Sequence, residues 1–391
     1  MFQSISSNYY AVLDLFITVH AEASQLHLLD RPCPHHHQHQ TPLFYAASLG
    51  HVSIVRLLVS SARCSPSSPL PTTGATPLYV ASKNGHVEVV EFLLHTISTQ
   101  MQSSQQSAGG VSRLPPSLSS LFAASHGGHI DIVKLLLSFS SPAPPALDFV
   151  RPSDGATALI ASASCGHAAV VRYLISVGAD PRLRKRDGTG PLFAAAQGGH
   201  HDVLNTLLSS DCPPRNRLRP DDEVRPTDGC TPLIIASQEG HASCVSVLLR
   251  NGASLRPSTS DDGATALSVA VAMGHADVVD VLLRAGADPN ATVGVAFLFR
   301  GVICPLTIAL RLEEKESAAE NVNDGTGNRP AADIVRMLVQ YGAVQWDARA
   351  RELGYIYGDP TPNGTYASAP DNRPSLNDLE DGVVKMNISR P

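Results

Sequence analysis

Aromatic residues and paired cysteines are both scarce in this sequence. Only 5% of the 391 residues are aromatic, with one tryptophan, Trp346, so a core has to be built from Ala, Leu, Val and Ile. The seven cysteines are scattered and no two have C-x-x-C spacing, which indicates neither a disulfide framework nor a zinc site. A reducing compartment is the simplest interpretation, so we expect a cytoplasmic location, with the nucleus as the alternative.

An excess of positive charge is also missing. The net charge of −6 gives no electrostatic reason to expect nucleic acid, which requires a basic face. The N-terminal segment lacks a basic n-region, and Asp14 interrupts its apolar run. Residues 293–310 approach the length of a membrane-spanning helix but contain Arg300, Gly301 and Pro305. We therefore expect the protein to contact neither nucleic acid nor a membrane.

Motifs that carry catalysis are absent as well. The sequence contains no P-loop, no G-x-G-x-x-G, no G-x-S-x-G and no H-E-x-x-H. The one dense cluster of metal-ligating residues is His35, His36, His37 and His39, just after Cys33, and we interpret it as a solvated linker. The sequence therefore predicts a protein that is not an enzyme and needs no cofactor or metal.

What the sequence does contain is an internal repeat. A Thr-Pro/Ala-Leu start, two small residues, a Gly-His pair and a Leu-rich run recur along the chain. The Gly-His histidines are separated by 35, 43, 38, 33, 41 and 34 residues, and they are His51, His86, His129, His167, His200, His241 and His275. Because they recur at one repeat position, we expect structural hydrogen bonds between neighbouring repeats and no metal or catalytic cluster.

Each position at which the same residue type recurs in the repeat has a physical explanation. The threonines Thr41, Thr76, Thr157, Thr231 and Thr265 are expected to cap a first helix, with proline or alanine at its first position. The glycine of each Gly-His pair supplies a left-handed stop. A second, amphipathic helix follows, as in residues 87–94, and four of the following turns close at an Asp-Gly pair, at Asp154, Asp187, Asp228 and Asp262.

This pattern resembles the T-P-L-H-x-A-A…G-H motif of the ankyrin-repeat family over residues 41–345. The resemblance implies an all-α solenoid of about eight stacked helix–turn–helix repeats with β-hairpin fingers. The last repeat is degenerate: it starts at Cys304, is split by a polar insertion at 313–330, and resumes at 332–343. Further insertions at 98–116, 138–152 and 211–227 are expected in surface loops between repeats.

Two departures from the family motif affect the expected loops. The histidine after T-P-L is replaced everywhere, by Phe44, Tyr79, Phe122, Ile160, Phe193, Ile234 and Ser268. We therefore expect packing to hold the loops in its place. The family's finger aspartate is replaced by Pro152, Lys185, Pro226 and Ser260, so we do not expect every finger to form a regular hairpin.

The two ends differ from the array. Residues 1–40 are interpreted as an N-terminal helix, which would cap the array, followed by the His-rich linker. Residues 346–391 are rich in Pro, Gly, Asn and Asp and are predicted to be a disordered tail. We expect the protein to be monomeric.

The resemblance implies that a concave groove, lined by finger tips and by the two residues before each Gly-His pair, binds another protein. The candidate binding residues are Lys83, Asn84, His126, Gln197, Gln238, Glu239 and Met273. Arg184, Lys185 and Arg186 form a basic finger that we expect to contact an acidic segment of the partner. The alternative is the substrate-recognition subunit of an enzyme complex, such as a ubiquitin-ligase adaptor or a host-directed effector, and a cryptic enzyme is the third interpretation.

Overall fold

The protein is described by a computed structural model that covers residues 41–60, 64–70, 73–104, 116–139, 147–209, 217–260, 263–291, 293–295, 301–319 and 330–343. The predicted N-terminal cap, the histidine cluster at 35–39 and the predicted tail at 346–391 lie outside these residues. The described part contains 16 helices and one two-stranded sheet. The chain divides into two compact units, Met1–Arg186 with Asn205–Leu218, and Asp187–Leu204 with Arg219–Pro391.

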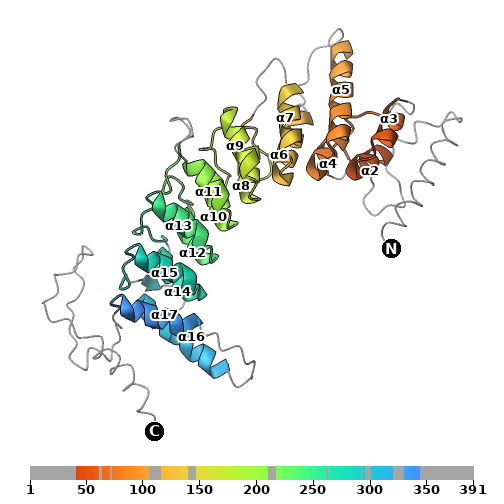
Figure 1. The fold of residues 1–391 in the computed structure, drawn as a ribbon. Helices are drawn as coiled ribbons and strands as arrows, with labels where there is room; N and C mark the ends of the chain where they lie inside the picture. The colour runs from red at the N-terminus through yellow and green to blue at the C-terminus, as the bar shows by residue number, and fades with distance from the viewer. Residues whose placement is uncertain are drawn as a thin grey trace, which may run out of the picture. The chain divides into compact units, whose positions relative to one another are not determined.

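The first unit is built from consecutive helix pairs (Figure 1). Its helices are α2 (Pro42–Leu49), α3 (Val52–Ser60), α4 (Pro77–Asn84), α5 (Val87–Ser104), α6 (Pro116–Gly127), α7 (Ile130–Phe139), α8 (Ala158–Ser164) and α9 (Ala168–Ser176). The first helix of each pair packs against the first helix of the next, so α2, α4, α6 and α8 form one layer. The second helices α3, α5, α7 and α9 form the other layer.

The second unit repeats this arrangement. Its helices are α10 (Pro191–Gln197), α12 (Pro232–Gln238), α13 (Ala242–Arg250), α14 (Ala266–Met273), α15 (Ala276–Arg284), α16 (Pro305–Ala319) and α17 (Pro330–Gln340), and α11 (His201–Leu208) contains the division between the units. The strands β1 (Val293–Val295) and β2 (Gly301–Ile303) pair antiparallel, with Val293 opposite Ile303. The first-helix layer is α10, α12, α14 and α16, and the second-helix layer includes α13, α15 and α17.

The predicted helix starts are confirmed. Each predicted cap threonine has an extended backbone and accepts the N–H three residues later on its side-chain oxygen, at 3.1–3.3 Å; the threonines are Thr41, Thr76, Thr157, Thr231 and Thr265. These bonds satisfy donors that the helix itself leaves unpaired. The first helices then bury small residues such as Ala47, Ala81 and Ala124 at 0% exposure, which lets neighbouring backbones approach closely.

Five of the seven Gly-His histidines join successive repeats, as the sequence predicted. In the first unit, the Nε2 atoms of His86, His129 and His167 lie 2.9–3.0 Å from the carbonyl oxygens of Ser48, Lys83 and His126. In the second unit, His241 contacts the Gln197 oxygen at 3.1 Å and His275 contacts the Gln238 oxygen at 2.9 Å. We call these five contacts the histidine ladder. Each links the start of a second helix to the end of the first helix of the preceding repeat.

The glycine of the Gly-His pair has two functions. It ends the first helix with positive φ, for example +78° at Gly240, and it leaves room for the imidazole of the next repeat. A Cβ at Gly240 would lie 2.8 Å from the ring of His275. At Gly274 the same space is empty, because the last repeat has Glu313 and Glu314 in place of the Gly-His pair.

Two predicted insertions begin as helix. α5 continues to Ser104, so residues 98–104 of the predicted loop are helical, and Figure 1 shows this helix extending past its neighbours. α16 continues to Ala319, so residues 313–319 at the start of the predicted polar insertion are helical. Both runs lack a glycine stop and contain good helix formers, namely Gln and Met in α5 and Glu, Lys and Ala in α16. Both helices therefore continue into the predicted insertions, as far as Ser104 in α5 and Ala319 in α16.

The glycines of the second unit provide a test of the histidine ladder. Gly240→Ala and Gly274→Ala both place a side chain at positive φ, which costs about 1–2 kcal/mol. Only Gly240→Ala also displaces His275 from the Gln238 carbonyl, which adds about 1 kcal/mol. We expect urea unfolding to show the larger loss for Gly240→Ala. Equal losses would show that the ring contact does not stabilise the stack.

Candidate functional site

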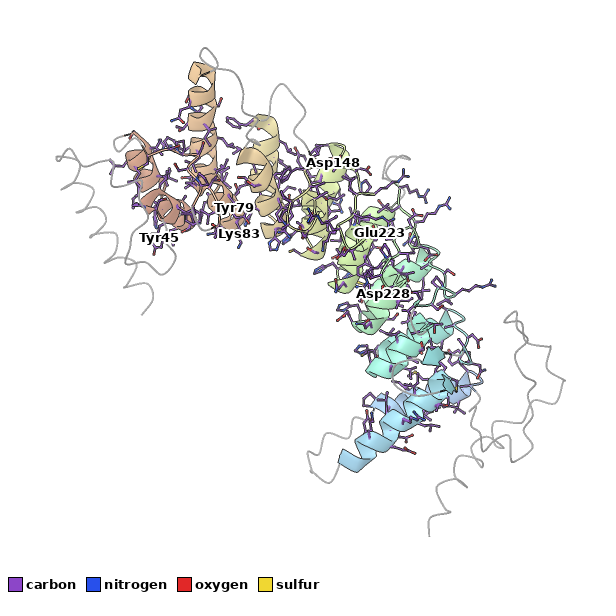
Figure 2. All side chains as sticks on the ribbon, turned by 180° about the vertical axis from the view of Figure 1, so that it is seen from behind. Tyr45, Tyr79, Lys83, Asp148, Glu223 and Asp228 are labelled. Carbon is purple, nitrogen blue, oxygen red and sulfur yellow. The ribbon has the colours of Figure 1, made fainter. Side chains whose placement is uncertain are left out.

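In the first unit, the predicted binding residues lie where the first helices end. Lys83 and Asn84 are the last residues of α4, and both side chains are exposed (Figure 2 labels Lys83). The Asn84 side-chain amide donates to the carbonyl oxygen of Ser48 at 2.8 Å, while the Lys83 carbonyl accepts from His129. The backbone at this site is thus fixed by the stack, and the Lys83 ammonium projects from it. No described carboxylate forms an ion pair with Lys83.

His126 occupies the same position on the next first helix, α6. Its side chain is exposed, and its ring stacks on Phe122 with the ring centroids 6.5 Å apart. Partial burial lowers the pKa of His126 below its usual value, and the positive charges of Lys83, His167 and Arg151 lower it further. The pKa direction shows that His126 lies in a positive environment made by several elements.

The second unit presents different chemistry at the equivalent positions. Gln197 is exposed at the end of α10, and Gln238 ends α12 with its side-chain amide 3.5 Å from the carboxylate of exposed Glu239. Met273 at the end of α14 is 55% exposed, the highest value among the large apolar side chains of the described residues. This face is therefore polar and apolar with one negative charge, and it contains none of the cations found at the equivalent positions of the first unit.

The fingers are six-residue turns with a common construction. In residues 151–156, the Arg151 N–H donates to the Ala156 carbonyl at 2.9 Å, and the Gly155 N–H donates back to Arg151 at 2.8 Å. Residues 70–75, 225–230 and 259–264 close in the same way. Each is one hairpin turn without flanking strands. Besides β1 and β2, the described residues contain only an isolated bridge between Ser258 and Thr265, which agrees with the expectation that not every finger is regular.

Arginine and aspartate side chains stabilise two of these turns. Arg151 pairs with Asp154, and Arg225 pairs with Asp228, whose carboxylate also accepts the Cys230 N–H at 3.1 Å. The prediction that packing alone holds the loops is thus incomplete, because an ion pair contributes as well.

Each of these arginines also covers an aromatic ring of the preceding repeat. The Arg151 guanidinium lies 4.4 Å from the Phe122 ring centroid, and Arg225 lies 5.0 Å from that of Phe193. Phe122 and Phe193 stand where the family motif has histidine. The expected packing of the loops therefore takes the form of arginine–aromatic stacking.

The predicted basic finger belongs to the same series of turns. Arg184 occupies the position that Arg151 and Arg225 occupy in theirs, three residues before the aspartate of the Asp-Gly pair. The Arg186 backbone N–H donates to the Asp154 carbonyl at 2.9 Å, and its side chain is exposed. Lys185 is half-buried. Arg184 and Arg186 both expose their side chains, but Arg184 shares its position with turn-stabilising arginines, whereas Nη1 of Arg186 donates to the Ser153 carbonyl of the preceding finger at 3.5 Å.

Sequence reasoning missed Glu223. Its side chain is 2% exposed, and its carboxylate accepts the Leu192 N–H at 3.1 Å and the Phe193 N–H at 2.8 Å (Figure 2). These are the first donors of α10, whose N-cap residue is Gly190 in place of the threonine that caps five other first helices. A Cβ at Gly190 would lie 2.5 Å from the Glu223 carboxylate. The absent cap threonine was the signal that another acceptor was needed.

The described residues contain no group of three His, Cys, Asp or Glu side chains arranged to hold a metal ion. None of their helices combines the length and apolar character needed to cross a membrane. Burial raises the pKa of the Cys230 and Cys244 thiols to about 11. These two cysteines are therefore thiols at neutral pH.

Stacked helix pairs joined by short turns define a helical-repeat protein of the solenoid class. A family model described as ankyrin repeats (3 copies) matches residues 1–103, 120–217 and 216–293. The chain belongs to the ankyrin-repeat family, as its motif predicted. Ankyrin repeats are protein–protein interaction modules. No curated protein is similar enough to the chain to count as a relative.

Glu223 and Gly190 should behave as a coupled pair. Glu223→Ala leaves two buried N–H groups of α10 unpaired, which should lower the free energy of unfolding by about 2 kcal/mol. Gly190→Thr alone should also destabilise, because its Cβ collides with the carboxylate. In the Glu223→Ala background, Gly190→Thr should recover about 1 kcal/mol by restoring the usual cap. Hydrogen exchange of the Leu192 and Phe193 amides measures both effects, and additive losses would exclude the pairing.

The Arg225–Asp228 pair predicts an acid-dependent stability. The Arg225 side chain, and then the Cys230 N–H, lower the pKa of Asp228 in the folded state. Its stabilisation is therefore complete above the unfolded pKa of about 4 and is lost as pH falls towards the lower folded pKa. We expect the free energy of unfolding of the wild type to exceed that of Asp228→Asn by about 1 kcal/mol at pH 6. This difference should shrink by pH 3.

An exposed pair of the same spacing provides the control for this prediction. Asp333 and Arg336 on α17 lie 3.0 Å apart but are 52% and 77% exposed. Asp333→Asn should therefore change the free energy of unfolding much less at both pH values. A similar loss for Asp333→Asn would mean that net charge, and not the finger turn, explains the effect of Asp228→Asn.

Proposed function

We propose that this protein binds a partner protein through the ends of its first helices and through its finger turns. The first unit contributes Lys83, Asn84 and His126 with the basic finger, and the second unit contributes Gln197, Gln238, Glu239 and Met273. The protein would act as a scaffold or adaptor without catalysis, in the cytoplasm or nucleus.

One observation carries this proposal. The first helices are mostly buried, yet six candidate residues before the Gly-His pairs expose their side chains: Lys83, Asn84, His126, Gln197, Glu239 and Met273. The histidine ladder takes up the carbonyls of three of them, Lys83, His126 and Gln197. For example, residues 191–196 of α10 are buried and Gln197 is exposed. A fixed backbone that presents variable side chains is the arrangement that favours specific recognition, because little order is lost on binding.

Site-specific photo-crosslinking tests the proposed face. A photoreactive residue placed at Gln197 or Gln238 in the full chain should crosslink a partner in cells. The same residue at Arg250 or Asp277, exposed positions of the second-helix layer, should not. Crosslinks only from Arg250 and Asp277 would assign binding to the other layer and contradict the proposal. Capture of the catalytic core of an enzyme complex would favour the substrate-recognition alternative.

The partner recovered in this way allows a kinetic control. Exposed charges act mainly on association, and salt screens them within about 8 Å. Lys185→Glu with Arg186→Glu should slow association several-fold at low salt, whereas Lys83→Ala with Gln238→Ala should speed dissociation. Arg184 is left unchanged, because a substitution there would mix turn stability with binding. Unchanged association rates at low salt would remove the basic finger from the binding face.

A further inference from the structure

The first-helix layer of the first unit has an uneven charge distribution. Within their bounds, α2, α4, α6 and α8 contain no aspartate or glutamate, and their charged or titratable side chains other than tyrosine are Lys83 and His126. The acidic residues of this unit's helices lie on the second-helix layer, at Glu88, Glu91 and Asp131. A chain with a net charge of −6 therefore presents a locally positive face here.

Five side chains gather on this face. Tyr79 and Lys83 lie one turn apart on α4 (Figure 2), and Phe122 and His126 lie at the matching positions of α6. Arg151 from the following finger covers the Phe122 ring at 4.4 Å, and Phe122 stacks on His126. Two cations, a phenol, an imidazole and an aromatic ring are thus placed together.

Some of this cationic capacity is unused. Asp154 engages Nε and Nη2 of Arg151, and no bond to a described residue engages its Nη1. Lys83 lacks an ion-pair partner among the described residues, as noted above. Arginine and lysine donors that stand together without enough carboxylates favour an anionic ligand.

We propose that the face formed by Tyr79, Lys83, Phe122, His126 and Arg151 binds an acidic segment of a partner protein and takes up a proton at His126 as it does so. This inference rests on the proposed function and specifies the chemistry of the partner at the first unit. Carboxylates of the segment pair with Lys83 and Arg151, and the protonated imidazole adds a third charge.

The surroundings of His126 explain the proton uptake. Three groups oppose a positive charge on His126: Lys83 on α4, His167 at the start of α9, and Arg151 in the finger. His129 bonds to the Lys83 carbonyl beside it. The Asp154 carboxylate is the negative group nearby, and Arg151 holds it. Burial, and then these cations, lower the pKa of His126 in the free protein. A bound carboxylate opposes them, so binding raises the pKa and strengthens as pH falls.

The test uses a synthetic twelve-residue Glu-rich peptide and a Gln-rich peptide of the same length as its control. With the full chain at low salt, fluorescence anisotropy should show the Glu-rich peptide binding at least several-fold more tightly. Its affinity should rise about three- to fivefold between pH 7.5 and pH 5.5. The NMR titration of His126 should shift to a higher pH when the peptide is bound.

Variants separate this face from net charge. Lys83→Glu should weaken the Glu-rich peptide about tenfold. Lys134→Glu, an identical change at an exposed position of α7, should have little effect. His126→Gln should keep most of the affinity at pH 7.5 and remove its pH dependence. Equal effects of Lys83→Glu and Lys134→Glu, or pH dependence that survives His126→Gln, would overturn the proposal.

Two further outcomes are informative. If a Gln-rich peptide with one phosphoserine binds more tightly than the Glu-rich peptide, the ligand is a phosphopeptide and the acidic-segment assignment is wrong. If the Glu-rich peptide fails to bind but Gln238 still crosslinks a partner, only the chemistry assigned to the first unit is overturned. The proposed function itself fails when the face residues crosslink nothing.

Discussion

The histidine ladder, in which a Gly-His imidazole contacts a carbonyl in the first helix of the preceding repeat, is the constraint on which the stack depends. It satisfies an acceptor that the end of a helix leaves unpaired, and it does so with a side chain from the next repeat. The glycine beside it has to lack a Cβ, both for its left-handed backbone and for the room the ring occupies. The same glycine therefore serves helix termination and repeat stacking, although Gly274 shows that it can end a helix without a ring from the next repeat.

Most of the fold could be predicted from sequence because its determinants are local. The threonine caps, the glycine stops and the amphipathic second helices each depend on residues within about one helical turn, and these predictions are confirmed. Glu223 could not be predicted in the same way, since the N–H groups that it accepts, those of Leu192 and Phe193, lie 31 and 30 residues earlier in the chain. Its position in the insertion 211–227 indicated a surface loop. The empty cap position at Gly190 indicated only that a partner was required.

The candidate site was predictable in position and not in chemistry. The register of the repeat places Lys83, His126 and Gln238 at the ends of first helices, and the structure finds them there. Which charges meet depends on contacts between repeats. Arg151 reaches the face from a finger that follows an insertion, and its pairing with Asp154 and stacking on Phe122 follow from no single spacing. The role of arginine in the fingers became visible only when Arg151 and Arg225 were found in the same arrangement.

The same contact that holds the repeats together also leaves the side chains of the candidate site free to vary. At Lys83 and His126 the backbone carbonyl belongs to the stack, whereas the side chain extends into solvent. Replacing such a side chain removes no buried group, so stability places little restriction on its identity. The first unit carries a lysine and a histidine at these positions and the second carries glutamine, glutamate and methionine, although both use the same ladder. The side chains at these positions are therefore set repeat by repeat, and under the proposed function the charge difference between the units would give each unit its own preference for a partner segment.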